Sequence, residues 1–361
     1  MGGTCCTLAL FEGELNKLNQ KTVELPDLEE GEILAQTSCA TICGSDLHTI
    51  EGKRSEPVPL ILGHEMIAKV KKIKSEKPIK DYWGQTIKLG DTITWSVVWS
   101  CDECERCLDN LPQKCLNLFK YGHERFENSR SLNGAFSEYC LLRKNTKIYK
   151  VPNGIEESVL SPSNCATATA ASCIDEVNVK NKTVLVQGGG LLGLMICAMS
   201  NFHGAKKTAL VDMKQDRTEM ALQFGAQDVF CLSDKISKNQ YLNESSNNSF
   251  DVVFECSGST EAMSDAMKKL KINGEYILAG AVFPTTKKSI DPETIIRKML
   301  TIKGVHNYKP HHLAKALTFL KDSKDRFPYE KIVGKTFPLQ EINSAVSYAQ
   351  KGLSLRTAIK F

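Results

Sequence analysis

From Lys182 onward, apolar segments alternate with helical segments, and this alternation constrains the fold more than any other feature of the chain. Regular strand–helix alternation is typical of a doubly wound parallel sheet, so the sequence predicts an α/β fold here. The polar segment 237–249 is expected to form a surface loop. The predicted strands are 183–186, 208–211, 251–254 and 276–279, and the predicted helices are 194–202 and 217–224.

A glycine motif, Gly188-x-Gly190-x-x-Gly193, follows the first of these strands and opens the first helix. In that context the glycines let backbone amides approach a pyrophosphate at the positive end of the helix. Asp212 ends the second strand, where a carboxylate hydrogen-bonds adenosine ribose hydroxyls and repels a 2′-phosphate. The motif therefore predicts a dinucleotide site that favours NAD over NADP.

The regions on either side of this alternating segment have a different pattern of apolar residues. Residues 1–155 contain short apolar runs broken by Gly, Pro and Asp, which is typical of a β-rich domain. A chain of 361 residues exceeds the size of one hydrophobic core, so two domains are expected. We expect a nucleotide domain at 156–304, inserted between 1–155 and a returning segment, 305–361. Within that last segment, helices are predicted at 310–320 and 342–349 and a strand at 355–361.

Four cysteines stand in a C-x2-C-x2-C-x7-C run with polar, loop-like neighbours. Short spacings of this kind let consecutive thiolates reach one tetrahedral ion, and Zn²⁺ takes four thiolates where its role is structural. Free cysteines usually lie in apolar surroundings instead. The run predicts a structural zinc loop formed by Cys101, Cys104, Cys107 and Cys115.

A second possible zinc site is scattered along the chain. Cys43 lies in the segment Cys-Gly-Ser-Asp-Leu-His, His64 in Gly-His-Glu, and Cys165 in Ser-Asn-Cys-Ala-Thr-Ala-Thr. Each segment alone is weak evidence, but together they offer three protein ligands and an open position. That is the arrangement of catalytic zinc.

Taken in order, the scattered zinc ligands, the four-cysteine lobe and the nucleotide motif resemble the zinc-dependent medium-chain alcohol dehydrogenase family over nearly the whole chain. The resemblance implies a GroES-like β-rich catalytic domain and a Rossmann domain. It also implies two Zn²⁺ ions per chain, one catalytic and one structural, with NAD as the hydride carrier. Zn²⁺ in such a site acts as a Lewis acid on the alcohol oxygen.

The resemblance assigns roles to further residues by motif position. Ser45 and His48 would form a proton relay, and Thr169 would lie against the nicotinamide. Asp46 would orient His64 as a supporting carboxylate, and Glu65 would be a nearby acid that can approach the metal. In the ending Leu-Arg-Thr, Arg356 would reach the cofactor pyrophosphate.

Two departures from the family pattern concern the segment after the His-Glu pair. Ala68 and Lys74 stand where glycines are expected, and a lysine-rich stretch continues to about Lys88. These changes remove no zinc ligand but leave the local strand geometry open. Cys165 stands where polyol dehydrogenases of the family often use a Glu, which disfavours sorbitol-like substrates.

The substrate is therefore expected to be a small alcohol or aldehyde, with polyols and threonine less favoured. An alternative comes from three segments that resemble a phosphonate-associated subgroup of the family: Lys53-Arg54, Tyr121 to Glu124 and Gly304 to Tyr308. On that alternative the substrate is a hydroxyalkylphosphonate or phosphonoacetaldehyde, whose dianion pairs with a cation at the pocket.

Charge and composition bear on the remaining classes. A formal net charge of +4 and an acidic cysteine loop argue against a nucleic-acid-binding zinc protein. A catalytically silent relative is disfavoured because the ligand and relay residues occur together. No run is long enough to span a membrane, no export signal is expected at the N-terminus, and fourteen cysteines without one favour the cytoplasm. The resemblance implies a homodimer or homotetramer.

Overall fold

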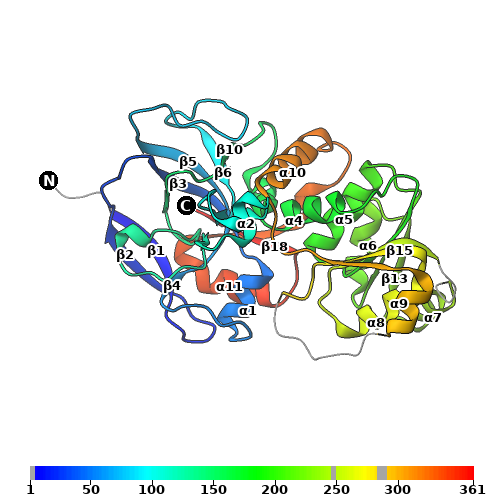
Figure 1. Cartoon of the computed structure of the whole chain (residues 1–361). Coiled ribbons are helices and arrows are strands. Elements are labelled where there is room, and N and C mark those ends of the chain that lie inside the picture. Colours follow the sequence, from blue (N-terminus) through cyan, green and yellow to red (C-terminus); the bar gives the residue numbers. More distant parts are fainter. Residues whose placement is uncertain (1–4, 245–248, 283–290) are drawn as a thin grey trace. The chain divides into compact units, whose positions relative to one another are not determined.

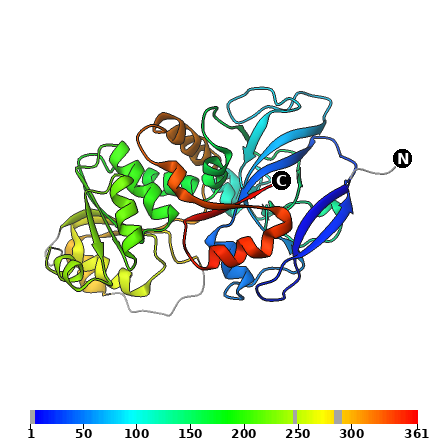
Figure 2. The same cartoon turned by 180° about the vertical axis from the view of Figure 1, so that it is seen from behind.

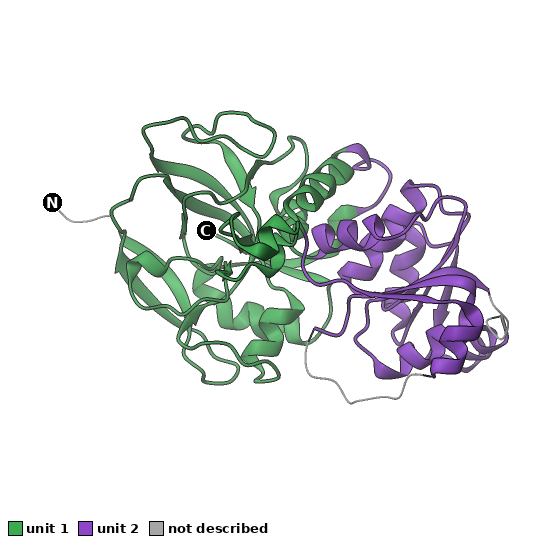
Figure 3. Ribbon diagram, viewed as in Figure 1, with its two compact units in different colours: residues 1–165, 309–321, 329–361 green, residues 166–308, 322–328 purple. Residues whose placement is uncertain are grey.

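The computed structural model describes residues 5–244, 249–282 and 291–361. These residues form two compact units, shown in two colours in Figure 3. The sequence-based boundaries were expected at 155/156 and 304/305, whereas the compact units divide at 165/166 and 308/309. The expectation of no export signal concerns the N-terminus, of which residues 1–4 lie outside the described part. Unit 1 comprises residues 1–165, 309–321 and 329–361, and unit 2 comprises 166–308 and 322–328.

Unit 2, in which Figure 1 labels β13 and β15, contains a parallel sheet whose strand order is β13-β12-β11-β14-β15-β16. Every neighbouring pair in it runs parallel. The order reverses at β11, as in doubly wound nucleotide-binding sheets, so the predicted α/β architecture is confirmed. The strands are β11 (Thr183–Gln187), β12 (Lys207–Asp212), β13 (Asp228–Cys231), β14 (Phe250–Glu255), β15 (Leu270–Leu278) and β16 (Thr301–Gly304).

The central strand of this sheet shows why its sequence is a continuous apolar run. Val184, Leu185 and Val186 are all fully buried, because a strand covered on both faces has no solvent side to supply polar residues. Connecting helices join the strands. They are α4 (Ala166–Asp175), α5 (Leu191–Phe202), α6 (Gln215–Gln223), α7 (Lys235–Glu244), α8 (Thr260–Lys269) and α9 (Pro292–Lys298).

Helix α7 corrects one prediction. The segment 237–249 was expected to be a loop, but its residues up to 244 continue α7, and 245–248 lie outside the described residues. The helix buries Tyr241, whose ring packs at 5.3 Å from the ring of Phe230 and under the Lys269 ammonium. One buried aromatic gives no helical repeat of apolar residues, so the pattern carried no signal for this helix.

Unit 1 is built on a seven-stranded sheet and a three-stranded sheet, with a two-stranded ribbon beside the cysteine lobe. Their pairing is mostly antiparallel, and the C-terminal strand β18 pairs with β3, so the end of the chain completes the first sheet. The strands are β1 (Cys5–Phe11), β2 (Asn19–Glu24), β3 (Glu32–Thr41), β4 (Leu60–Ile61), β5 (Glu65–Lys74), β6 (Thr92–Trp95), β7 (Val98–Trp99), β8 (Phe119–Lys120), β9 (Tyr139–Leu142), β10 (Ile148–Lys150), β17 (Val333–Pro338) and β18 (Arg356–Lys360).

The segment whose glycines are missing forms one continuous strand, although its pairing is irregular at two points. β5 pairs with β3 along its whole length, with two register shifts, and both Ala68 and Lys74 take part in this pairing. Ala68 is fully buried against the core of unit 1. The departure from the family pattern therefore leaves the strand intact, because a small apolar side chain fits the position that a glycine would occupy.

Helices complete unit 1, and Figure 2 shows α11 in red beside β18, on which it packs. No described helix is long and apolar enough to cross a membrane. The α-helices are α1 (Gly44–Ile50), α2 (Glu105–Leu108), α3 (Glu157–Leu160), α10 (Pro310–Asp322) and α11 (Ile342–Gln350), and short 3-10 turns span Pro112–Lys114, Ser129–Ser131, Ser161–Asn164, Tyr329–Ile332 and Leu339–Glu341.

Candidate active site and metal centres

Unit 1 gathers the three scattered ligand candidates into one buried cluster with Glu65, within 4.8 Å of one another. The Cys43 and Cys165 sulfurs are 3.9 Å apart, and the Cys165 sulfur lies 3.3 Å from Nε2 of His64. Cys43 is the N-cap of α1, His64 immediately precedes β5, and Cys165 follows a 3-10 turn. Two thiols and an imidazole at these separations fit a zinc ion with one open position.

Asp46 ties the ligand segments together. Its Oδ1 accepts from Nδ1 of His64 at 3.2 Å and from the Gly63 amide at 3.3 Å, and its Oδ2 accepts from the Cys43 amide at 2.9 Å. Burial opposes protonation of His64, but the Asp46 carboxylate outweighs burial and raises the pKa of the imidazole to about 10. Because Nδ1 is held by Asp46, Nε2 is the nitrogen left for a metal.

The two cluster thiols share one ionisation. The hydrogen bond from Cys165 holds the pKa of Cys43 well below its usual range, with burial opposing and the Arg356 charge assisting. The same hydrogen bond and burial raise the pKa of Cys165. Cys43 is therefore the thiolate of the pair, which suits it to be the first thiolate ligand.

An ion pair with Arg356 fixes the side chain of Glu65. Its two oxygens accept from Nε and Nη2 of Arg356, both at 2.7 Å, and the Thr41 hydroxyl donates to Oε2 at 2.6 Å. Arg356 Nη2 also lies 3.6 Å from the Cys43 sulfur. Arg356 thus has its partners in unit 1 beside the metal cluster, and contact with a cofactor pyrophosphate stays a prediction.

The two relay candidates lie on α1, three residues apart, which places them on neighbouring parts of one helix face. The Ser45 hydroxyl is 3.5 Å from Nε2 of His64. His48 is half-buried, and burial, assisted by the charge of Lys53, lowers its pKa below the ordinary value of 6.5. His48 is therefore neutral at neutral pH and able to accept a proton.

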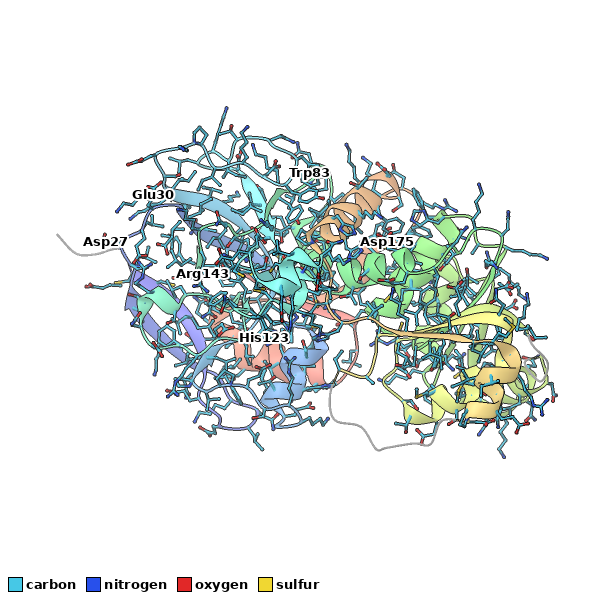
Figure 4. All side chains as sticks on the ribbon, viewed as in Figure 1. Asp27, Glu30, Trp83, His123, Arg143 and Asp175 are labelled. Carbon is cyan, nitrogen blue, oxygen red and sulfur yellow. The ribbon has the colours of Figure 1, made fainter. Side chains whose placement is uncertain are left out.

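Close backbone packing brings a further segment against the metal cluster. A Cβ on Gly122 would lie 2.3 Å from the Gly63 oxygen, and Gly122 has φ +77°, so both contact and conformation demand glycine. The next residue, His123, lies with its ring centroid 5.1 Å from that of His64, and Figure 4 labels it. Its Nδ1 bonds Glu56 at 2.9 Å.

Two residues of this neighbourhood were not singled out from the sequence. They are Glu56, which contacts both His123 and Arg54, and Lys120, which begins the turn that carries His123. Glu56 belongs to no motif. Lys120 immediately precedes the Tyr-Gly-His-Glu segment, so the segment itself was the available signal.

The four-cysteine lobe forms a second cluster, with every sulfur within 4.8 Å of the others. Neighbouring sulfurs are 3.4 to 3.8 Å apart. Hydrogen bonds from the backbone amides of Leu116 and Cys107 lower the pKa of Cys104 to about 6. Asp102 and Asn110 adopt positive φ, which lets the loop turn tightly around its sulfurs. The donor set fits one tetrahedral zinc ion bound by thiolates.

In unit 2 the glycine motif lies where β11 ends and α5 begins. A Cβ on Gly193 would lie 1.9 Å from the Gly188 oxygen, so this glycine is needed for helix–strand packing. Gly188 has φ +105°, which serves the turn. A Cβ on Gly190, the N-cap of α5, would meet nothing within 4 Å. Packing does not require that glycine, and the open space at the helix N-terminus fits a phosphate.

Asp212 lies at the end of β12, as expected. Its Oδ2 accepts from the Gly189 amide at 2.6 Å and its Oδ1 from the Lys214 amide at 2.8 Å, so the carboxylate is fixed beside the glycine loop. Thr169 lies in α4 and is partly buried. Thr169 belongs to unit 2, and its role against a nicotinamide stays a prediction.

Two family models match the chain. "Alcohol dehydrogenase GroES-like domain" matches residues 29–153, and "Zinc-binding dehydrogenase" matches residues 192–322. The first match lies within unit 1 and identifies its β-rich fold as GroES-like. The second covers most of the doubly wound sheet.

Full-length relatives agree with these matches. The chain is 25% identical to 5-exo-hydroxycamphor dehydrogenase of Pseudomonas putida over 355 residues, 96% of each chain. It is 26% identical to L-threonine 3-dehydrogenase of Vibrio cholerae over 291 residues, 79% of each. A solved alcohol dehydrogenase from Thermotoga maritima superimposes with a TM-score of 0.92 at 26% identity, covering 99% of this chain and 100% of that one.

Proposed function

The chain belongs to the zinc-dependent medium-chain alcohol dehydrogenase family, and we therefore propose that it transfers a hydride between a small alcohol or aldehyde and NAD(H). The observation that carries the proposal is the buried cluster of Cys43, His64 and Cys165, with Ser45 adjoining it. The direct test follows NADH formation from short-chain alcohols by zinc-loaded protein. A protein that binds zinc in both clusters and oxidises none of them contradicts the proposal.

The geometry of the site suggests a separate role for each of its residues. When bound, zinc would polarise the substrate oxygen and the nicotinamide would carry the hydride. Asp46 fixes the ring of His64, and Arg356 fixes the carboxylate of Glu65 by binding both of its oxygens. Ser45 would take the proton of the substrate hydroxyl, and His48, neutral at neutral pH, would release it to solvent. Proton transfers of this kind contribute roughly 10²–10⁴-fold.

The relay predicts a particular pH dependence. His48 accepts a proton only when neutral, and burial together with Lys53 holds its pKa below 6.5. Alcohol oxidation should therefore stay constant through neutral pH and fall only as pH drops through that lowered value. Lys53→Met removes a positive charge, so the pKa of His48 rises and the acid limb moves to higher pH. The shift should be less than about one unit because Lys53 is exposed.

The measurement is the profile of kcat/KM against pH for the wild type, Lys53→Met and His48→Gln. The glutamine variant cannot titrate, so its acid limb should disappear and its turnover near neutral pH should fall, with zinc content unchanged. An acid limb that persists in His48→Gln, or zinc lost from it, is incompatible with the relay role.

Preference for NAD over NADP is proposed from Asp212. A carboxylate fixed at the end of β12 repels a 2′-phosphate, and like charges brought together cost several kcal/mol. Asp212→Asn keeps the acceptor for Gly189 but removes the charge. The ratio of kcat/KM with NAD to that with NADP should fall by about 10²-fold. Asp216→Asn, a nearby exposed carboxylate, is the matched control. An unchanged ratio in Asp212→Asn would remove Asp212 as the determinant.

For the substrate, a small alcohol or aldehyde is the primary proposal, and a hydroxyalkylphosphonate or phosphonoacetaldehyde is the alternative. Relatives named for threonine and arabinitol keep those substrates as candidates, although Cys165 in place of a Glu disfavours polyols. Comparing the reduction of phosphonoacetaldehyde with that of acetaldehyde, and both with threonine oxidation, decides among them. Equal rates for the two aldehydes contradict the anionic alternative.

Assembly and location complete the proposal. A homodimer or homotetramer is proposed from the family, and light scattering of the purified protein measures it. A cytoplasmic location is proposed because none of the fourteen cysteines takes part in a disulfide, as expected in a reducing compartment.

A further inference from the structure

The turn that begins at Lys120 is packed onto the metal cluster. The His123 amide donates to the Lys120 oxygen at 3.0 Å, closing the turn, and the Lys120 amide donates to Glu124 at 2.9 Å. Between them, Gly122 contacts the backbone of residue 63 and the Cβ of His64 so closely that no side chain fits. The backbone of Lys120 is therefore held two residues from the point where this turn packs on the ligand segment.

Three cations of unit 1 lie in this region, and two are already paired. Lys53 forms a salt bridge with Glu51 at 2.6 Å, and Arg54 forms one with Glu56 at 2.6 Å. Within the described ranges, the ammonium of Lys120 forms no salt bridge with a carboxylate. Both cations of the Lys53-Arg54 segment, which the sequence suggested for an anionic substrate, are thus engaged, and Lys120 is the one of the three left for a ligand.

The surroundings of Lys120 make its charge costly unless an anion pairs with it. Its side chain is partly buried, and burial, followed by repulsion from Arg54, lowers its pKa. The thiols of Cys165 and Cys43 are close enough to act on it electrostatically. A zinc ion between those thiolates would neutralise them and leave the ammonium without that support. A desolvated cation beside the metal ligands then gains most from an anion brought by the substrate.

We propose that Lys120 is a specificity-determining residue that pairs with an anionic group, a carboxylate, phosphate or phosphonate, carried by the alcohol or aldehyde substrate. The inference rests on the proposed dehydrogenase function and narrows its substrate class. Glu56 supports the arrangement, because it neutralises Arg54 and anchors His123, and so leaves one net positive charge among these three cations. A neutral alcohol leaves that charge unpaired, whereas an anionic one satisfies it.

The test compares Lys120→Met with the wild type on matched aldehydes. Phosphonoacetaldehyde and malonate semialdehyde carry the anion, and acetaldehyde and propanal do not. We expect the wild type to prefer the anionic pair and Lys120→Met to lower kcat/KM for them by roughly 10- to 100-fold. The neutral pair should change less than about twofold. The two anionic aldehydes separate a phosphonate requirement from a general one.

Two further variants serve as controls. Lys120→Arg should restore most of the preference, and Lys21→Met, which removes an exposed cation of unit 1 already paired with Glu12, should leave it unchanged. Binding of 2-hydroxyethylphosphonate to the zinc-loaded protein, measured by calorimetry without cofactor, should weaken by a similar factor in Lys120→Met. Zinc content and tryptophan fluorescence establish that each variant is folded.

The failures are distinguishable. If the wild type reduces neutral and anionic aldehydes equally, or if Lys120→Met lowers both alike, Lys120 does not select an anion and the inference is wrong. If the wild type reduces no aldehyde with NADH at all, the dehydrogenase proposal itself fails.

Discussion

Replacement of Glu65 by alanine should lower the free energy of unfolding of unit 1 by about 3–5 kcal/mol, the cost of breaking a buried ion pair. Glu65 is fully buried, and its two oxygens bind the Arg356 guanidinium at 2.7 Å each. Alanine leaves that guanidinium buried without its counter-ion, and this unpaired charge is the physical cause of the loss.

The measurement can be confined to the unit concerned. The chain has three tryptophans, Trp83, Trp95 and Trp99, and all belong to unit 1, so their fluorescence during urea unfolding reports that unit. Glu14→Ala is the control, because Glu14 pairs with Lys17 at an exposed position and should cost less than about 1 kcal/mol. If Glu65→Ala costs no more than this control, the pair contributes nothing to the stability of unit 1.

The number of zinc ions bound per chain should change when a cysteine of either cluster is replaced. The wild type should bind two zinc ions per chain, and Cys43→Ser and Cys104→Ser should each lower this number by one. Cys43→Ser should also reduce turnover at least about 10³-fold, because the site loses the ion that stabilises charge on the substrate oxygen. Cys104→Ser should act through stability, since bound metal contributes directly to the folding of its loop.

Metal analysis by mass spectrometry, with turnover measured on the same samples, tests this division. Cys39→Ser is the matched control, because Cys39 is buried in unit 1 and belongs to neither cluster. It should keep both ions and its activity. Two ions and full turnover in Cys43→Ser would show that the scattered cluster is not the working site.

The elements that could be predicted from the sequence are those with a local residue pattern. Strands such as 183–186 and the glycine turn after them were readable, because a buried strand is continuously apolar and a tight turn demands glycine. The residue pattern did not predict helix α7, because Tyr241 is the one buried side chain among its described residues. Local patterns report local structure, whereas the Tyr241 ring of α7 packs against Phe230 and Lys269, which belong to other elements of unit 2.

The site divides in the same way. Metal ligands are restricted to a few residue types at restricted spacings, so the two groups of candidate ligands that the structure brings together could be named from sequence alone. The partners of Arg356 could not, because Glu65 lies 291 positions away along the chain and no motif links the two. Lys120 was missed for the same reason. No motif contains it, and the charged groups around it come from other segments of the chain.

The sequence by itself determined which residues are candidates for chemistry: two groups of potential metal ligands, a glycine turn suited to a dinucleotide and two proposed relay residues on one helix. These depend on residue type and on spacing within a short segment. The tertiary structure decided which charges are paired. Packing of Gly122 against Gly63 brings Lys120 beside the cluster while Glu56 neutralises Arg54, and such neutralisation depends on distances between segments that the linear order leaves open.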